Sequence, residues 1–235
     1  SIVVSCNTNN NRLAADWGID GIAAFMAQMG LGSRTGIDIE GESTGVLPSP
    51  EWKKKRFKKP EQQKWYAGET ISVGIGQGYN AYTMLQLAHA TAILAADGVV
   101  YKPHLVKQVE NVRTGAVRQI EPQPTRRVNL KPEHIAVIKQ AMEDVNKAGT
   151  GARAFAGAPY VAAGKTGTAQ AFSLRGAQYR GGKLAEKLRD HALFIAYAPA
   201  DDPKIALAVI VENAGFGAQS AAPIARQVFD YYLLG

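Results

Sequence analysis

The sequence predicts a mixed α/β (α+β) fold, in which an antiparallel sheet is flanked by helices. Two short apolar runs, residues 192–198 and 205–211, are separated by Pro-Ala-Asp-Asp-Pro at residues 199–203, a pattern typical of a β-hairpin. A further strand is expected around residues 165–168, and the amphipathic segment 223–234 closes the chain as a helix. A strand, a hairpin and a helix in this order indicate an antiparallel sheet with helices packed on it.

Three segments before the sheet are predicted to be helical. Residues 12–29 carry apolar side chains at helical spacing, and two glycines among them suggest two shorter helices. Residues 83–96 share an apolar face that ends at Gly98, a residue type common just after a helix. Residues 132–145 begin with proline and glutamate, which suit a first helical turn.

The connecting segments are predicted from their turn residues and composition. Residues 30–78 are rich in glycine, proline and charge and are expected to be a long irregular connection. Residues 99–112 should form a strand that turns at Thr114-Gly115 and returns through residues 117–120. The polar, glycine-rich and basic segment 172–190 is expected to be an insertion, either a lid beside a cleft or a disordered loop.

Composition limits the class of protein. With 235 residues, 46% of them hydrophobic, the chain can form one sizeable core, and its length alone allows one or two domains. It contains no apolar run of roughly eighteen residues, and its first residues do not resemble a signal peptide. The single cysteine excludes an internal disulfide framework and is compatible with the cytosol or the periplasm.

The tetrapeptide Lys165-Thr166-Gly167-Thr168 is the most informative stretch of the chain. If it is an edge strand, Lys165 and Gly167 point to one face and the two threonines to the other. An extended substrate could then pair with the strand, its carboxylate held by the hydroxyls and the lysine charge, while Gly167 allows a close approach. The alternative is a surface turn, because three common residues meet by chance in many chains.

A second polar element lies near the N-terminus, at Ser5-Cys6-Asn7. Ser5 offers a hydroxyl that can pass a proton, and Asn7 an amide that can donate and accept. Their spacing suits a turn aimed into a cleft. The alternative is a cap of the helix that begins near Arg12.

Taken together and in this order, the two elements resemble the second and third active-site motifs of the penicillin-binding proteins and serine β-lactamases. Further stretches are similar to the class B transpeptidases, and the basic run before Pro60 resembles the elongation-specific group, penicillin-binding protein 2. These stretches are residues 36–48, 52–60, 65–78, 82–90 and 149–152.

The resemblance implies a function. It implies a peptidoglycan D,D-transpeptidase that acts on stem peptides ending in D-Ala-D-Ala and is acylated by β-lactams. By family implication the catalytic residues are Ser5, Asn7 and Lys165, and Thr166, Gly167 and Thr168 bind the substrate. It implies no cofactor and no metal in this chain. The implied partners are a membrane glycan polymerase and the rod-shape elongation proteins, and the implied location is the periplasmic face of the inner membrane.

These enzymes acylate a serine in a Ser-x-x-Lys motif, and no serine of this chain has a lysine three places later. In the family that motif precedes the Ser-x-Asn element. We therefore expect residues 1–235 to be the C-terminal part of one transpeptidase domain, with the nucleophile and the membrane anchor in an upstream segment. Alone, the chain should form no acyl-enzyme.

The formal charge of +7 is concentrated in residues 53–59, where six of seven side chains are basic. One interpretation is a solvated loop. The other is attraction to anionic lipid head groups or to the carboxylates of cell-wall peptides. No nucleic-acid motif accompanies the run, so nucleic acid is not expected as a partner.

Cys6 has two interpretations. It is either a buried, inert thiol or a metal ligand, since some elongation-specific relatives use the equivalent cysteine with acidic and histidine ligands from upstream. A zinc site needs about four ligands, and the others are not found near Cys6 in this sequence.

Two functional alternatives to the transpeptidase remain. The same fold serves β-lactamases and β-lactam sensors, although no obvious Glu-x-x-x-Asn stretch for a water-activating base follows the Ser-x-Asn motif. A non-catalytic cell-wall scaffold would keep the fold without the chemistry. The stability of a penicillin adduct separates the three.

Overall fold

The computed structural model describes residues 1–170 and 189–235. A three-stranded antiparallel sheet lies at its centre, with β5 (Ala163–Ala169), β6 (His191–Ala198) and β7 (Ile205–Val211) in this order. All three strands were expected from the sequence, and β6 and β7 are joined by the predicted hairpin connection.

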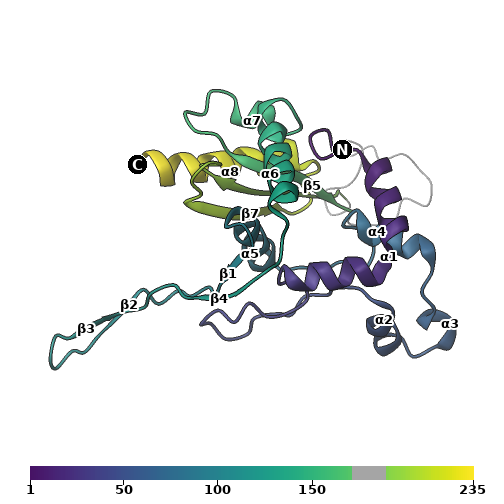
Figure 1. The fold of residues 1–235 in the computed structure, drawn as a ribbon, viewed down its shortest axis with the longest axis horizontal. Helices are drawn as coiled ribbons and strands as arrows, with labels where there is room; N and C mark the ends of the chain where they lie inside the picture. Colours follow the sequence, from purple (N-terminus) through teal and green to yellow (C-terminus); the bar gives the residue numbers. More distant parts are fainter. Residues whose placement is uncertain (171–188) are drawn as a thin grey trace.

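Helices cover both faces of this sheet. α8 (Gly217–Leu234) packs on the face that carries Phe194, whereas α5 (Met84–Ala95) and α6 (Pro132–Lys147) lie on the face that carries Tyr197 (Figure 1). Both aromatic side chains are fully buried. Because burial of a side chain as large as phenylalanine contributes about 1.5–3 kcal/mol, these contacts hold the helices on the sheet. The predicted fold class is confirmed.

The closing helix starts earlier than its sequence indicates, at Gly217 rather than at residue 223. The main-chain N–H groups of Gln219 and Ser220 donate to the oxygen of Phe216 and form the first turn, at 3.0 and 3.2 Å. The apolar pattern of residues 223–234 does not reveal the first turns, because most residues from 217 to 222 are small. Pro223 is therefore not the first helical residue. It lies inside the helix instead, where its missing N–H removes one bond of the ladder.

The first residue of α8 contacts β5, which contains Lys165-Thr166-Gly167-Thr168 and is called the motif strand below. A Cβ added at Gly217 would overlap the main-chain oxygens of Gly167 and Leu193. We expect Gly217→Ala to lower the free energy of unfolding by about 2 kcal/mol, because overpacking displaces the helix from the sheet. Urea unfolding measures this change.

Gly68 provides the matched control for that substitution. It lies in α4 (Ala67–Gly74), and a Cβ there would meet nothing within 4 Å. Gly68→Ala should leave the stability unchanged or raise it slightly, because alanine is the better helix former. Equal effects of the two substitutions would show that the close approach at Gly217 does not limit stability.

The N-terminal part is a layer of helices. α1 (Asn7–Gln28) is interrupted at Gly18, whose φ of +78° is not helical, so the expectation of two shorter helices is confirmed. Ile22 of α1 packs against Val73 of α4. This contact holds α4 against α1.

The expectation of an irregular connection over residues 30–78 was wrong in part. Besides α4, the segment contains α2 (Pro50–Arg56) and α3 (Pro60–Gln63). Helices of one or two turns are too short to show an apolar period and depend on capping and tertiary contacts. In α2, the Ser49 hydroxyl accepts the N–H of Trp52 at 3.1 Å.

The predicted strand over residues 99–112 is two strands. β1 (Val99–Tyr101) pairs with β4 (Pro124–Arg127), and β2 (Gln108–Glu110) forms the predicted hairpin with β3 (Val117–Gln119). Pro103 interrupts the segment, and a proline cannot donate to a ladder. Strand pairing therefore changes partner between β1 and β2.

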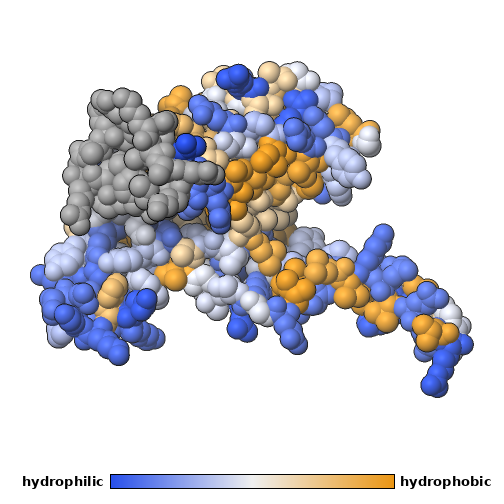
Figure 2. Space-filling model, turned by 180° about the vertical axis from the view of Figure 1, so that it is seen from behind, coloured by the Kyte–Doolittle hydropathy of each residue, from blue (hydrophilic) through white to orange (hydrophobic). Residues whose placement is uncertain are grey.

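The β2–β3 hairpin extends away from the body of the molecule (Figure 1). Seen from behind, hydrophobic and hydrophilic side chains alternate along it (Figure 2). Val109, Val112 and Val117 are among its exposed apolar residues. The hairpin thus contributes little to the core.

Two sequence predictions concern membranes and the insertion. None of the helices within the described ranges has both the length and the apolar character of a bilayer span. The predicted insertion at residues 172–190 lies, except for its last two residues, outside the described residues. Its interpretation as a lid or a disordered loop stays a prediction.

Candidate active site

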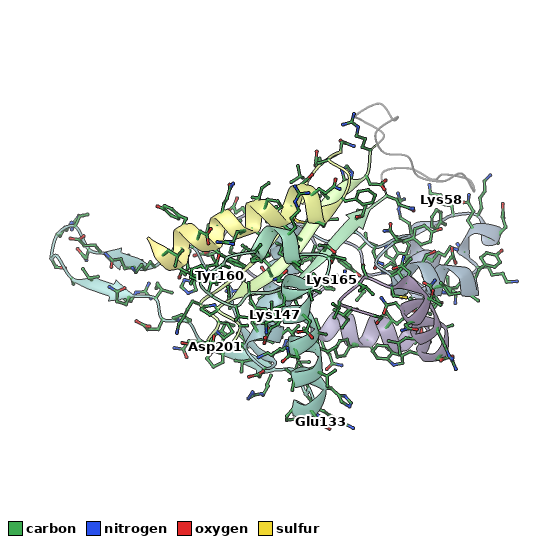
Figure 3. The ribbon with its side chains drawn as sticks, turned by 90° about the horizontal axis from the view of Figure 1, so that it is seen from above. Lys58, Glu133, Lys147, Tyr160, Lys165 and Asp201 are labelled. Carbon is green, nitrogen blue, oxygen red and sulfur yellow. The ribbon has the colours of Figure 1, made fainter. Side chains whose placement is uncertain are left out.

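The side chains of Ser5 and Lys165 are in contact, although 160 positions separate them in the sequence. Lys165 Nζ donates to Ser5 Oγ at 2.8 Å and to the main-chain oxygen of Thr166 at 2.8 Å. Figure 3 shows Lys165 near the middle of the molecule, between the sheet with its helices and the N-terminal helices. The two predicted motifs therefore meet at one point.

A tight turn presents the Ser5 hydroxyl. The N–H of Ser5 donates to Ile2 O at 3.2 Å, and that of Cys6 to Ser1 O at 3.0 Å. Ser5 has a φ of +53°, in the left-handed region that non-glycine residues rarely adopt. Such a conformation costs on the order of 1–3 kcal/mol and persists only where neighbouring contacts hold it.

Thr150 connects this turn to the motif strand. Its N–H donates to the main-chain oxygen of Val3 at 3.2 Å, and its hydroxyl lies 2.8 Å from that of Thr166. A Cβ at Gly149 would overlap Val3, so the glycine permits the close approach. Sequence reasoning did not assign Thr150 to the site, although the stretch 149–152 contributed to the family resemblance.

Burial lowers the pKa of Lys165 below the ordinary lysine value, because a half-buried ammonium loses hydration. Its neutral form is thus reached at a lower pH than in an exposed lysine. The neighbouring Ser5 hydroxyl can both donate and accept. The pair can therefore pass a proton along a chain of hydrogen bonds, or hold a positive charge close to an anionic ligand.

Within the described residues β5 is an edge strand, as predicted. Lys165 pairs with Ile195 and Thr166 with Phe194 across the β5–β6 ladder. Because side chains alternate along a strand, Lys165 and Gly167 lie on one face and the two threonines on the other. A Cβ at Gly167 would come 3.2 Å from that of Leu193, so this glycine also serves packing against β6.

Asn7 and Cys6 mark the start of α1. Asn7 is its first helical residue and is exposed, and Cys6 is the cap residue. The expectation of a buried Cys6 thiol was wrong, since the residue is only partly buried. Hydrogen bonds from the N–H groups of Thr8 and Asn9 lower the pKa of Cys6 by stabilising its thiolate.

Among residues 1–170 and 189–235, no three His, Cys, Asp or Glu side chains gather closely enough to hold a metal ion. Of the described residues, Cys6 thus has no companions for a zinc site, which needs about four ligands. Metal ligation by Cys6 with residues from an upstream segment stays a prediction.

The basic run of residues 53–59 is not uniformly solvated. Lys53 is only 3% exposed, and its ammonium is paired with the Glu69 carboxylate and surrounded by aromatic rings. Two interpretations of the basic run were open, a solvated loop and attraction to anionic partners. For Lys53 both were wrong, because its charge faces inward. The remaining basic side chains of the run are exposed, and their attraction to anionic partners stays a prediction.

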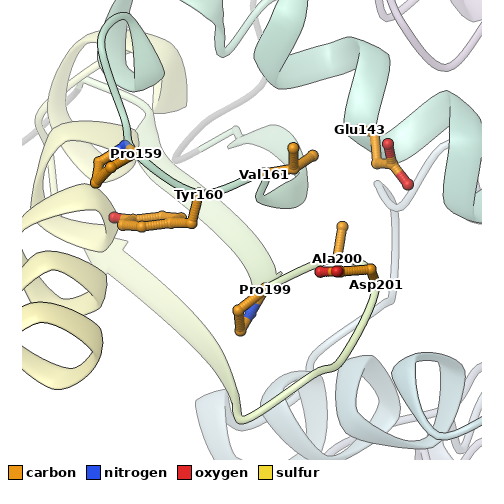
Figure 4. Close-up of a pocket in the computed structure, with 7 residues that line it drawn as sticks. All are labelled: Glu143, Pro159, Tyr160, Val161, Pro199, Ala200 and Asp201. Atoms are coloured by element: carbon orange, nitrogen blue, oxygen red, sulfur yellow. The ribbon is translucent and has the colours of Figure 1, made fainter.

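A separate cavity of about 490 Å³ lies at the end of β6 (Figure 4). No residue of the two motifs lines it. It is therefore distinct from the Ser5–Lys165 contact. Its lining residues are Glu143, Pro159, Tyr160, Val161, Pro199, Ala200 and Asp201.

Comparison with protein families identifies the class to which this fold and site belong. Residues 1–230 match the penicillin binding protein transpeptidase domain, and the chain belongs to this family. It is similar to the peptidoglycan D,D-transpeptidase MrdA of Haemophilus influenzae, with 45% identity over 99% of this chain and 36% of the relative. It is 40% identical to MrdA of Escherichia coli K12, over 100% of this chain and 37% of the relative. The chain thus spans about a third of the length of these curated relatives.

Solved structures agree with this assignment. Penicillin-binding protein 2 of Pseudomonas aeruginosa, in complex with WCK 5153, is 38% identical and has a TM-score of 0.79, over 97% of this chain and 47% of that chain. A peptidoglycan synthase complex contains a chain with 30% identity and a TM-score of 0.79, over 98% of this chain and 36% of that chain. At 24% identity, penicillin-binding protein 2 of Helicobacter pylori, in complex with MreC, shows the same fold, with a TM-score of 0.79 over 100% of this chain and 39% of that chain. The predicted likeness to penicillin-binding protein 2 is confirmed.

Proposed function

We propose that this chain is the C-terminal part of a peptidoglycan D,D-transpeptidase domain and supplies two of its three active-site motifs. The observation that carries the proposal is the 2.8 Å hydrogen bond between Lys165 Nζ and Ser5 Oγ beside an edge strand. The nucleophilic serine and its lysine belong to the segment that precedes Ser1. Membership of the transpeptidase family supports this arrangement.

The reaction is an acyl transfer with an acyl-serine intermediate. The upstream serine oxygen bonds to the penultimate D-alanine carbonyl carbon, and the motif lysine takes the serine proton. Ser5 passes a proton to the nitrogen of the terminal D-alanine as its bond to the carbonyl breaks. The amine of a second stem peptide then attacks the ester, forms the cross-link and releases the serine.

Substrate recognition uses the edge of β5. The hydroxyls of Thr166 and Thr168 and the charge of Lys165 hold the terminal carboxylate, and Gly167 leaves room for the ligand backbone. The N–H of Thr168 and that of the nucleophilic serine bind the developing oxyanion, where one donor contributes about 3–4 kcal/mol in the transition state. Asn7 holds the peptide amide of the donor.

Relatives support a place in the cell-wall machinery. One structural neighbour is part of a peptidoglycan synthase complex, and another is bound to MreC. We infer that a membrane glycan polymerase and the rod-shape elongation proteins are partners of the whole protein. The domain then lies at the periplasmic face of the inner membrane, anchored by its upstream segment.

Fluorescent penicillin tests the proposal on the full-length protein. A stable covalent adduct, blocked by prior unlabelled penicillin, is the expected result, because an acyl-serine ester without a water-activating base hydrolyses slowly. The isolated chain of residues 1–235 is the matched control and should remain unlabelled. Rapid turnover would indicate a β-lactamase instead, and no labelling of the full-length protein would indicate a scaffold.

A further inference from the structure

The side-chain amide of Gln77 lies against the outer edge of β5. Its Nε2 donates to the main-chain oxygen of Thr168 at 2.7 Å, and its Oε1 accepts the N–H of Gln170 at 3.4 Å. A residue of an added strand would offer its own N–H and C=O to these same groups, which flank Ala169. Gln77 thus occupies the edge in the manner of a strand residue.

A hydrogen-bonded turn holds Gln77 in this position. Its N–H donates to Ser72 O at 2.9 Å, and Asn80 Nδ2 donates to the main-chain oxygens of Gln77 and Val73, both at 3.0 Å. Glycines at positions 76 and 78 supply the positive φ angles, +78° and +71°, that the turn requires. The amide is therefore aimed at the strand by the end of α4 and is only partly exposed.

The contact of Gln77 with β5 leaves some hydrogen-bonding groups of the strand edge occupied and others facing outward. Lys165 Nζ already binds the oxygen of Thr166, and Gln77 binds that of Thr168. Since the N–H and C=O of one strand residue point to the same side, the N–H of Thr168 also faces outward. Without a ligand, the carbonyls of Thr166 and Thr168 are both occupied by side chains, while the Thr168 N–H faces outward.

We propose that Gln77 is a specificity-determining residue that competes with the ligand for the Thr168 carbonyl. A ligand that offers only an acceptor to the edge binds without moving the glutamine. A ligand that adds as a strand and presents an amide N–H must share the Thr168 oxygen with Nε2 or displace it, and both weaken its binding. This inference rests on the proposed function, because it assumes that acylating ligands bind along β5.

The test compares two β-lactams in the full-length protein. A penicillin carries an acylamino N–H beside its ring, and a carbapenem lacks this group. Gln77→Ala should raise the second-order acylation rate of the penicillin about five-fold, the factor that one net hydrogen bond represents, and leave that of the carbapenem unchanged. Gln77→Met keeps the side-chain length but cannot donate, so it should show the same selective gain.

The outcomes separate this inference from the function on which it rests. Gln62→Ala, at an exposed glutamine of α3, is the matched control and should change neither rate. Equal rates for the variants and the unsubstituted protein with both ligands, or a slower penicillin reaction in a variant that reacts normally with the carbapenem, would overturn the competition while leaving the transpeptidase intact. Failure of the unsubstituted protein to react with either ligand would overturn both proposals. A misfolded variant would react more slowly with both ligands, so misfolding cannot produce the selective gain with the penicillin.

Discussion

Lys165→Met is expected to lower the rate of penicillin acylation about a thousand-fold in the full-length protein. Loss of one positioned proton-transfer group or one electrostatic donor in a transition state typically costs a factor of 10² to 10⁴. Lys165 combines both roles in the proposed site, because its ammonium contacts Ser5 and the edge strand at 2.8 Å. The time course of fluorescent penicillin labelling measures the change.

Stability distinguishes a catalytic loss from unfolding. Burial lowers the pKa of Lys165, which means that the fold disfavours its charged form. Replacement by an apolar side chain of similar length should therefore leave the free energy of unfolding unchanged or slightly higher. Lys147→Met removes an exposed lysine of α6 and serves as the matched control, with labelling at the original rate. Labelling of Lys165→Met at the normal rate would contradict the catalytic role assigned to Lys165.

Lys53→Met is expected to lower the free energy of unfolding by about 3 kcal/mol, the usual cost of breaking a buried ion pair. Lys53 Nζ is paired with Glu69 and donates to Lys64 O at 2.7 Å. It also lies 5.3–5.8 Å from the centres of three aromatic rings, those of Trp65, Tyr66 and Tyr79. A desolvated cation–π contact adds up to about 2 kcal/mol. Urea unfolding measures the loss.

Lys54→Met supplies the comparison, because Lys54 is the exposed neighbour on the same helix and in the same basic run. A surface substitution of this kind should change stability by less than about 0.5 kcal/mol. Similar losses for both variants would mean that the basic run acts through its total charge rather than through one buried contact.

The contribution of the Lys53–Glu69 pair should depend on pH. Burial alone would raise the pKa of Glu69, but hydrogen bonds from Lys53 and the Tyr66 N–H outweigh it and the pKa lies below the usual range. The unfolded chain then binds more protons in acid, so the stabilisation is present above about pH 4.3 and is lost as the pH falls through the lowered pKa. The stability difference between the unsubstituted protein and Lys53→Met should shrink in this range. A difference that stays constant down to pH 3 would contradict the electrostatic account.

Long periodic segments and turn residues were predicted well because their signals are local. The apolar faces of α5 and α6 repeat over several turns, and the hairpin between β6 and β7 is marked by two prolines and two aspartates. The break in α1 at Gly18 also follows from one residue type. Each of these features depends on side chains that are close together in the sequence.

The basic run shows where local signals fail. Nothing between residues 53 and 59 distinguishes the buried Lys53 from its exposed neighbours, because its carboxylate partner and the three aromatic rings around its ammonium come from residues 65–79. The same holds for Thr150 and Gln77, which reach the motif strand from distant segments. Such contacts cannot be predicted from the spacing of residues within one segment.

The sequence by itself determined the family, the fold class and the residues of the two motifs, since these depend on residue types and their order. Only the tertiary structure decided that Ser5 touches Lys165, that Lys53 is buried and that Gln77 occupies the edge of β5. Contacts of this kind form when packing of the sheet and its helices brings distant segments within hydrogen-bonding distance, and that packing is a property of the whole chain.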